Sequence, residues 1–181
     1  MAWPERIEGD GFVLRDWREE DAGAIALHAN DPLVARSLGD RFPHPYTFDD
    51  AAWFILRALR GEGERTWAIE VNGEAAGSIG VNPGEGVERH SAELGYWLAR
   101  AYWGEGIATA AVRALVPHAM RELRLYRLQA RVFADNPASM KVLERAGFAH
   151  EAVLRRLVVK DDRLLDMHVY AITRETLDAQ G

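Results

Sequence analysis

The sequence contains no cysteine among its 181 residues. Disulfides, thiolate metal sites and cysteine nucleophiles are therefore excluded, so the chain cannot transfer an acyl group through a cysteine. The six histidines are scattered, without HExxH or Cys/His groupings, and a metal site is not expected. No apolar run approaches the length of a membrane span, and the acidic start of the chain is unlike a signal peptide. We therefore expect a cytoplasmic protein that does not associate with a membrane.

A basic excess is also lacking, since the formal net charge is −6. Nucleic-acid-binding surfaces normally carry an excess of Lys and Arg, so nucleic acid is not expected as a partner. No repeat, low-complexity tract or long linker divides the chain, and 48% of its residues are hydrophobic, enough for one sizeable core. The composition thus predicts one domain over residues 1–181.

Hydrophobic periodicity and turn residues predict strands and helices in mixed order. Strands are expected at 12–15, 66–71, 75–81, 91–99, 128–133, 152–159 and 164–172. Helices are expected at 19–29, 47–60, 104–116 and 137–145. Pro117 should end or kink the third helix. Runs of strands interrupted by helices favour an α+β fold, with a mixed, mostly antiparallel sheet of about seven strands flanked by helices.

The segment Trp103–Thr109 reads W-G-E-G-I-A-T, so two glycines one residue apart open a helical run. Such a turn suits a phosphate, because glycines admit an anion close to the backbone and the free N–H groups at a helix start attract it. Gly106 is followed by Ile107 and Ala108 instead of Lys-Ser or Lys-Thr, which excludes a Walker A loop. Thr109 stands where the dinucleotide fingerprint needs Gly or Ala, which disfavours that motif as well.

The pattern that remains is Q/R-x-x-G-x-G/A, with Trp103 at the position of Gln or Arg. It resembles the acetyl-CoA loop of the GNAT N-acetyltransferases, in which backbone amides bind the pyrophosphate. Residues 135–148, D-N-P-A-S-M-K-V-L-E-R-A-G-F, resemble the strand end, helix and Gly-Phe turn that follow in that family. Further similarity at Phe12–Arg15 and Asp166–Tyr170 is greatest to the RimJ/RimL-like subgroup. The resemblance implies the GNAT fold and direct acetyl transfer from acetyl-CoA to a primary amine.

The resemblance also implies catalytic residues. Glu93 matches the general base of many GNAT enzymes; the alternative is an exposed glutamate on an alternating strand. Ser139 matches the hydroxyl proposed to protonate the coenzyme A thiolate in RimL-like relatives; the alternative is an ordinary serine in a first helical turn. Gly95 predicts a bulge or a close backbone approach beside them.

The coenzyme and the acceptor should each have their own contacts. Expected coenzyme contacts are Leu98, Ala99, Arg100, Trp103, Gly104, Glu105, Gly106, Ile107, Ala108, Thr109 and Asn136, which is also a good N-cap. Expected acceptor contacts are Phe42, His44, Tyr46 and Tyr170, although His44 also suits a surface loop and Tyr170 the core. Candidates for binding the 3′-phosphate of the coenzyme are Lys141, Arg145 and one or two of Arg121, Arg124, Arg127 and Arg131, although these four arginines also suit a solvated basic face.

The acceptor is less well defined than the donor. A protein N-terminal α-amine of the ribosomal-protein type is the first expectation, and a small amine such as a polyamine, an amino acid or an antibiotic is the second. No dense acidic cluster singles out a polycation. A catalytically silent coenzyme A-binding module is a further alternative, against which the presence of both Glu93 and Ser139 argues. The exposed last hairpin and the aromatic content permit a homodimer.

Overall fold

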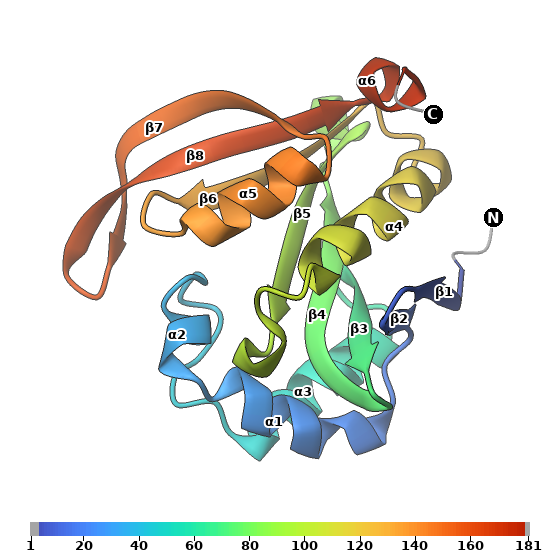
Figure 1. Cartoon of the computed structure of the whole chain (residues 1–181), viewed down its shortest axis with the longest axis vertical. Helices are drawn as coiled ribbons and strands as arrows, with labels where there is room; N and C mark the ends of the chain where they lie inside the picture. Colours follow the sequence, from blue (N-terminus) through green and yellow to red (C-terminus); the bar gives the residue numbers. More distant parts are fainter. Residues whose placement is uncertain (1–3, 180–181) are drawn as a thin grey trace.

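The computed structural model describes residues 4–179, which form one eight-stranded sheet (Figure 1). The strands are β1 (Arg6–Gly9), β2 (Phe12–Arg15), β3 (Arg65–Val71), β4 (Glu74–Pro83), β5 (Ser91–Leu98), β6 (Arg127–Phe133), β7 (Ala149–Lys160) and β8 (Arg163–Thr173). Their order is β1-β2-β3-β4-β5-β6-β8-β7, antiparallel throughout except for the parallel pair β5 and β6. The expected mixed, mostly antiparallel sheet is confirmed. β1 is additional, and with a single buried residue, Ile7, it carries no alternating hydrophobic pattern.

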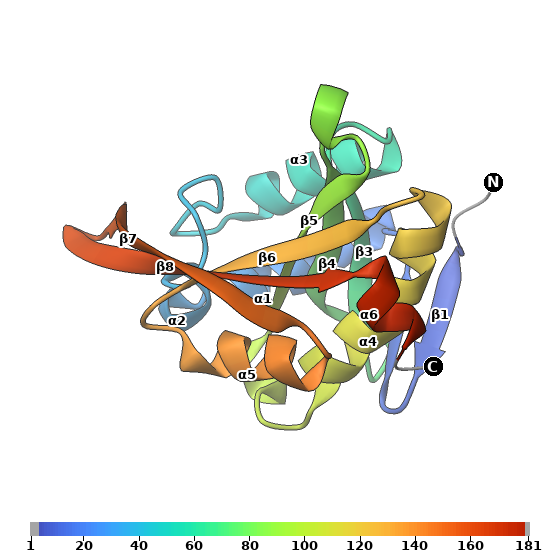
Figure 2. The ribbon, with the colours of Figure 1, turned by 90° about the horizontal axis from the view of Figure 1, so that it is seen from above.

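Helices cover both faces of this sheet, as the view from above shows (Figure 2). They are α1 (Ala22–Ala29), α2 (Pro32–Ala35), α3 (Phe48–Leu59), α4 (Ile107–Glu122), α5 (Pro137–Arg145) and α6 (Arg174–Asp178). The main core lies between the sheet and the pair α4 and α5, and a second core lies beneath α1 and α3 on the opposite face. Among the described residues, no helix has the length and apolar character needed to cross a membrane.

The central helix α4 differs from its predicted extent. It begins at Ile107 and runs through Pro117 to Glu122. The predicted helix end near residue 116 is therefore wrong, because Pro117 does not end the helix. Proline removes one backbone donor and is costly inside a helix. Buried side chains on both sides of the proline, from Val116 to Ala119 and Met120, hold the helix on the sheet and outweigh that local cost.

The turns that the sequence marks are present. Asn72 and Gly73, between β3 and β4, both have positive φ, of 52° and 82°. Asp161 and Asp162 join β7 to β8 with φ of 49° and 59°. Two residues of positive φ are the signature of type I′ turns, which match the twist of the strands they join. The second of these hairpins reaches beyond the body of the sheet, and its turn lies beside the region that follows α2 (Figure 1).

Candidate active site

A cavity opens where the two parallel strands separate. β5 and β6 are paired only from Ser91 and Arg127 to Glu93 and Gln129, although both strands continue past these residues. Beyond that point lies a cavity of about 800 Å³, lined by both strands, by the first turn of α4, by α5 and by the region around α2. Of the residues of β5 in its lining, Tyr96 and Leu98 pack with the main core and Trp97 with the second core. The cavity therefore gives access to both faces of the sheet.

The glycine-rich loop lies at one end of this cavity. Gly104 and Gly106 have φ of +83° and +84°, in the left-handed region that side chains other than glycine rarely adopt. The first intrahelical bond of α4 runs from the Ala110 N–H to the Gly106 oxygen at 3.0 Å. The three preceding N–H groups, at residues 107–109, therefore have no acceptor within the helix and point out of its positive end. This geometry suits an anion.

Trp103, the residue that departs from the family pattern, has a structural role. Its indole Nε1 donates to the backbone oxygen of Leu98 at 2.7 Å, which ties the loop to the end of β5. The backbone N–H of Ala99 donates to the backbone oxygen of Ala76 on β4 at 2.7 Å, which continues the pairing of β4 with the end of β5. The loop is thus held in place without using the amides of the α4 terminus.

Ser139 projects from the first turn of α5. Asn136 caps this helix, because its Oδ1 accepts from the Ser139 N–H at 3.2 Å, as the sequence predicts. The Ser139 hydroxyl lies 2.7 Å from the hydroxyl of Tyr96, which also lies 3.3 Å from the Ser139 backbone oxygen. Burial raises the pKa of Tyr96 to about 12, so this phenol keeps its proton at neutral pH. When the Tyr96 phenol donates to the hydroxyl oxygen of Ser139, the hydroxyl proton of Ser139 is free to be donated to another group.

Glu93 and Arg131 form an ion pair across the point where β5 and β6 separate. The Arg131 Nε donates to Glu93 Oε1 at 2.8 Å, and both side chains are partly exposed and line the cavity. The bulge expected at Gly95 is absent, because β4 and β5 pair without interruption from Pro83 and Ala92 to Gly77 and Leu98. A Cβ atom at Gly95 would stand 3.4 Å from the Glu64 side chain and would contact no backbone atom, so the alternative, a close backbone approach, stays a prediction.

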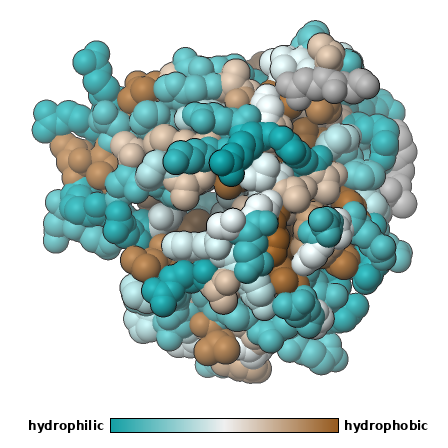
Figure 3. Space-filling model, viewed as in Figure 1, coloured by the Kyte–Doolittle hydropathy of each residue, from teal (hydrophilic) through white to brown (hydrophobic). Residues whose placement is uncertain are grey.

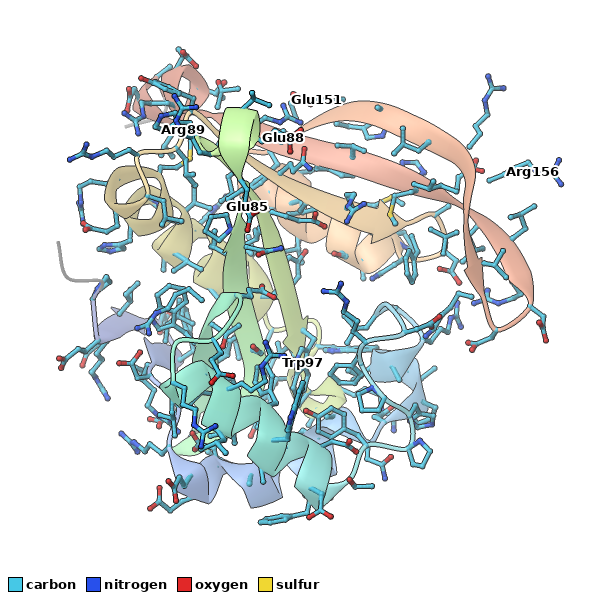
Figure 4. The ribbon with its side chains drawn as sticks, turned by 180° about the vertical axis from the view of Figure 1, so that it is seen from behind. Glu85, Glu88, Arg89, Trp97, Glu151 and Arg156 are labelled. Atoms are coloured by element: carbon cyan, nitrogen blue, oxygen red, sulfur yellow. The ribbon has the colours of Figure 1, made fainter. Side chains whose placement is uncertain are left out.

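The aromatic residues Phe42 and Tyr46, which the sequence analysis expects at the acceptor, pack behind Trp97. Trp97 lines the cavity and lies on the α3 side of the sheet (Figure 4). Phe42 packs against it with 5.7 Å between the ring centroids, and Tyr46 lies behind Phe42 at 4.9 Å. Neither Phe42 nor Tyr46 reaches the lining, and His44 is exposed between them. Phe42 and Tyr46 thus support the cavity wall through Trp97.

Tyr170 is a correction. Only 3% of this residue is exposed, and it packs in the main core without lining the cavity. Its hydroxyl donates to Glu144 Oε1 on α5 at 3.1 Å. The alternation along β8 turns Tyr170 towards α5, and the alternative expectation of a core residue is the correct one.

Most of the other predicted site residues line the cavity, and a few lie outside it. The cavity lining includes Leu98, Trp103, Gly104, Gly106, Ile107, Ala108, Thr109, Asn136, Ser139 and Glu93. Ala99, Arg100 and Glu105 lie outside it, and Arg100 forms an ion pair with Asp31 at 3.3 Å. Of the six candidates for the 3′-phosphate, the lining includes Arg131, Lys141 and Arg145. Arg131 is engaged by Glu93, which leaves the exposed pair Lys141 and Arg145 on α5.

Ion pairs join the segments around the mouth of the cavity. Asp135 Oδ2 accepts from Arg36 at 3.3 Å and from Arg163 at 2.7 Å, and Lys160 donates to Asp40 at 3.0 Å. These contacts connect the turn of the β7–β8 hairpin to the region after α2. Figure 3 shows the surface hollowed between these two parts, with mostly hydrophilic side chains around it.

Sequence reasoning missed Tyr96 as a functional candidate. The alternation Leu94, Tyr96, Leu98 could have placed it on the α5 face, but its contact with Ser139 depends on how α5 is docked.

Groups of three or more metal-ligating side chains are absent from residues 4–179.

These features together are those of an acetyltransferase: a parallel strand pair that separates over a cavity, and a helix start built for an anion. The family model of the acetyltransferase (GNAT) domain matches residues 12–149. The chain belongs to the GNAT family of acetyltransferases.

Individual relatives agree with this assignment. YoaA of Bacillus subtilis strain 168, an uncharacterized N-acetyltransferase, is 33% identical over 174 residues, which cover 93% of this chain and 96% of YoaA. The ribosomal-protein-serine acetyltransferase of Escherichia coli K12 is 37% identical over 100 residues, 54% of this chain and 54% of that enzyme. The structure of Mycobacterium smegmatis RimJ in complex with CoA-disulfide matches with a TM-score of 0.83 at 28% identity, covering 97% of this chain and 90% of RimJ.

Proposed function

We propose that this acetyltransferase transfers the acetyl group of acetyl-CoA directly to a protein N-terminal α-amine. The observation that carries the proposal is the cavity itself, whose lining contains the anion-binding loop, Ser139 and Glu93 together. The similarity to the ribosomal-protein-serine acetyltransferase supports a protein as the acceptor. A small amine is the second candidate, since the carboxylate of Glu93 and the ring of Trp97 in the cavity lining would accept one as well.

The donor side fits coenzyme A. The free N–H groups of residues 107–109 and the positive φ of Gly106 form a cradle for a pyrophosphate. Backbone groups near the end of β5 and the side chain of Asn136 border the path that a pantetheine arm would follow. The coenzyme supplies an activated thioester carbonyl, while the protein supplies its orientation and the protons.

Each catalytic residue has a distinct task. The acceptor must lose a proton before its nitrogen can form a bond to the carbonyl carbon. Two carboxylates line the cavity, and since Asp135 is bound to Arg36 and Arg163, Glu93 is the better placed of the two to assist this step, directly or through water. As the carbon–sulfur bond breaks, the leaving thiolate takes a proton from the hydroxyl of Ser139. Tyr96 orients that hydroxyl and, with its raised pKa, remains a donor.

The cost of deprotonation favours an α-amine. At pH 7 an α-amine with a pKa near 8 loses its proton for about 1 to 1.5 kcal/mol, whereas a lysine or polyamine nitrogen near 10.4 costs about 4.5 kcal/mol. Glu93 is partly exposed and bound to Arg131. A partly solvated carboxylate of this kind is suited to the easier of the two tasks.

Thiol release from acetyl-CoA across a panel of peptides, polyamines, amino acids and aminoglycosides tests the proposal. At pH 7 we expect peptides with free N-termini to react about 250-fold faster than polyamines, which corresponds to the difference in deprotonation cost. N-terminally blocked copies of the same peptides are the matched control. Faster release with small amines would establish the second candidate, and tight binding of acetyl-CoA without release on any acceptor would establish a silent module.

The 3′-phosphate provides a separate prediction. Replacing both Lys141 and Arg145 with alanine should raise the KM for acetyl-CoA about tenfold, because exposed ion pairs contribute about 0.2 to 1 kcal/mol each. The double variant should no longer distinguish acetyl-CoA from its 3′-dephospho form, which steady-state kinetics can measure. A variant with Arg121 and Arg124 replaced, both outside the cavity, is the control. Retained discrimination in the Lys141 and Arg145 variant would contradict the assignment.

A further inference from the structure

A second carboxyl group lies beside Glu93, and it belongs to Glu64. This residue immediately precedes β3, in the turn that follows α3. Although Glu64 is exposed overall, its Oε1 atom lies over two glycines of the neighbouring strands. A Cβ atom at Gly80 would stand 2.5 Å from this oxygen, and one at Gly95 would stand 3.4 Å from it. The carboxyl therefore occupies space that a side chain at Gly80 would fill.

The two glycines are register partners, which makes this space continuous. Gly80 on β4 pairs with Gly95 on β5, and Gly80 also pairs with Thr66 on β3. Partners in an antiparallel ladder point to the same face, so the gap runs from the Glu64 carboxyl to Gly95. Gly95 is part of the cavity lining, as is Glu93 two residues before it on the same face. Glu64 is thus placed behind a glycine window in the acceptor side of the cavity.

The basic side chains near Glu64 are paired with other carboxylates. Glu93 faces it from β5 but is bound to Arg131 of β6. From the end of α3, Arg57 is directed to Glu62 at 3.7 Å, and on β3 Arg65 donates to Asp16 at 2.7 Å. Within residues 4–179 no lysine or arginine forms an ion pair with Glu64. Loss of water around the carboxyl, and next the charge of Glu93, raise the pKa of Glu64.

We propose that Glu64 is a further catalytic residue, which takes up the proton of the acceptor amine through the Gly80 and Gly95 window while Glu93 keeps its charge against Arg131. The inference rests on the proposed function and deepens it. The nitrogen–hydrogen bond of the ammonium breaks, its electron pair stays on nitrogen for attack on the carbonyl, and the proton ends on the Glu64 carboxylate. Glu93 stays ionised and attracts the ammonium, and the proton passes to Glu64 directly or through water. A carboxylate that binds protons more tightly than usual is the better acceptor.

Two variants distinguish Glu64 from Glu93. Glu64→Gln should lower kcat about 100-fold at neutral pH, within the range for a lost general base. In the wild-type enzyme, kcat at saturating acceptor should rise with pH through a limb above the usual glutamate pKa near 4.3. Glu64→Gln should remove this limb. Glu93→Gln should keep the limb but move it to lower pH, because the repulsion that raises the pKa of Glu64 is gone.

Glu62→Gln is the matched control, since Glu62 lies in the same turn and is bound to Arg57 on the surface. An unchanged limb in Glu64→Gln, with its loss in Glu93→Gln, would overturn the proposal and leave Glu93 as the sole base. Carbon-13 NMR titration of the glutamate carboxyls without acceptor gives an independent readout. One elevated titration should vanish in Glu64→Gln and move down in Glu93→Gln. An absence of transfer on every acceptor would instead refute the proposed function, while this titration pattern would still be measurable.

Discussion

Replacing Ser139 with alanine is expected to lower kcat about 100-fold and to leave the affinity for acetyl-CoA within about twofold of wild type. The hydroxyl is placed by two independent contacts, the cap from Asn136 to its own N–H and the phenol of Tyr96 at 2.7 Å. General acids contribute about 10² to 10⁴ in rate, and a thiolate is a good leaving group with a conjugate acid pKa near 8.5. The effect should therefore lie at the lower end of that range.

Steady-state kinetics and calorimetric binding of acetyl-CoA measure the two quantities separately. Ser139→Thr keeps a hydroxyl and should recover a large part of kcat, which a purely structural role for the serine would not predict. Ser91→Ala, at the start of β5 and outside the cavity, is the control for removal of a hydroxyl from the same sheet region. If kcat of Ser139→Ala equals that of wild type, the thiolate takes its proton from another source.

Local rules predicted the backbone of the glycine-rich loop, the cap of α5 and the first hairpin turn. The helix start at Gly106, the cap by Asn136 and the hairpin turn at Asn72 depend on the conformational preferences of a few adjacent residues. Such features are encoded within a short segment, so the sequence alone contains the information. The same holds for the pattern of the strands and the longer helices, with the exceptions of β1, of the short helices α2 and α6, and of both ends of α4.

The contacts around Glu93 and Tyr170 depend on long-range register and were predicted less well. Tyr170 is a core residue, as the alternation along β8 allowed, but its contact with Glu144 depends on how the β6–β8 pair lies under α5. The ion pair of Glu93 with Arg131 depends on how β5 aligns with β6 across more than thirty residues of chain. Glu64 is a surface glutamate by sequence and becomes a partner of the site only through the alignment of Gly80 with Gly95.

Gly106→Val is expected to weaken the binding of acetyl-CoA by about 30-fold. Valine would have to adopt a φ near +84° at this position, in a region that costs a side-chain-bearing residue about 1 to 3 kcal/mol. A Cβ atom would meet no other atom within 4 Å, so the cost arises from the backbone conformation and not from a clash. The loop would relax away from this conformation, and coenzyme binding would have to restore it.

Gly11→Val is the matched control for this strain. Gly11, between β1 and β2, has a φ of +78° and equally open surroundings, but it lies outside the cavity. Both variants should lose similar thermal stability, whereas only Gly106→Val should lose affinity for acetyl-CoA in calorimetry. Since the amides of residues 107–109 take their direction from Gly106, this comparison separates anion binding from folding. Wild-type affinity in a folded Gly106→Val protein would place the pyrophosphate away from the start of α4.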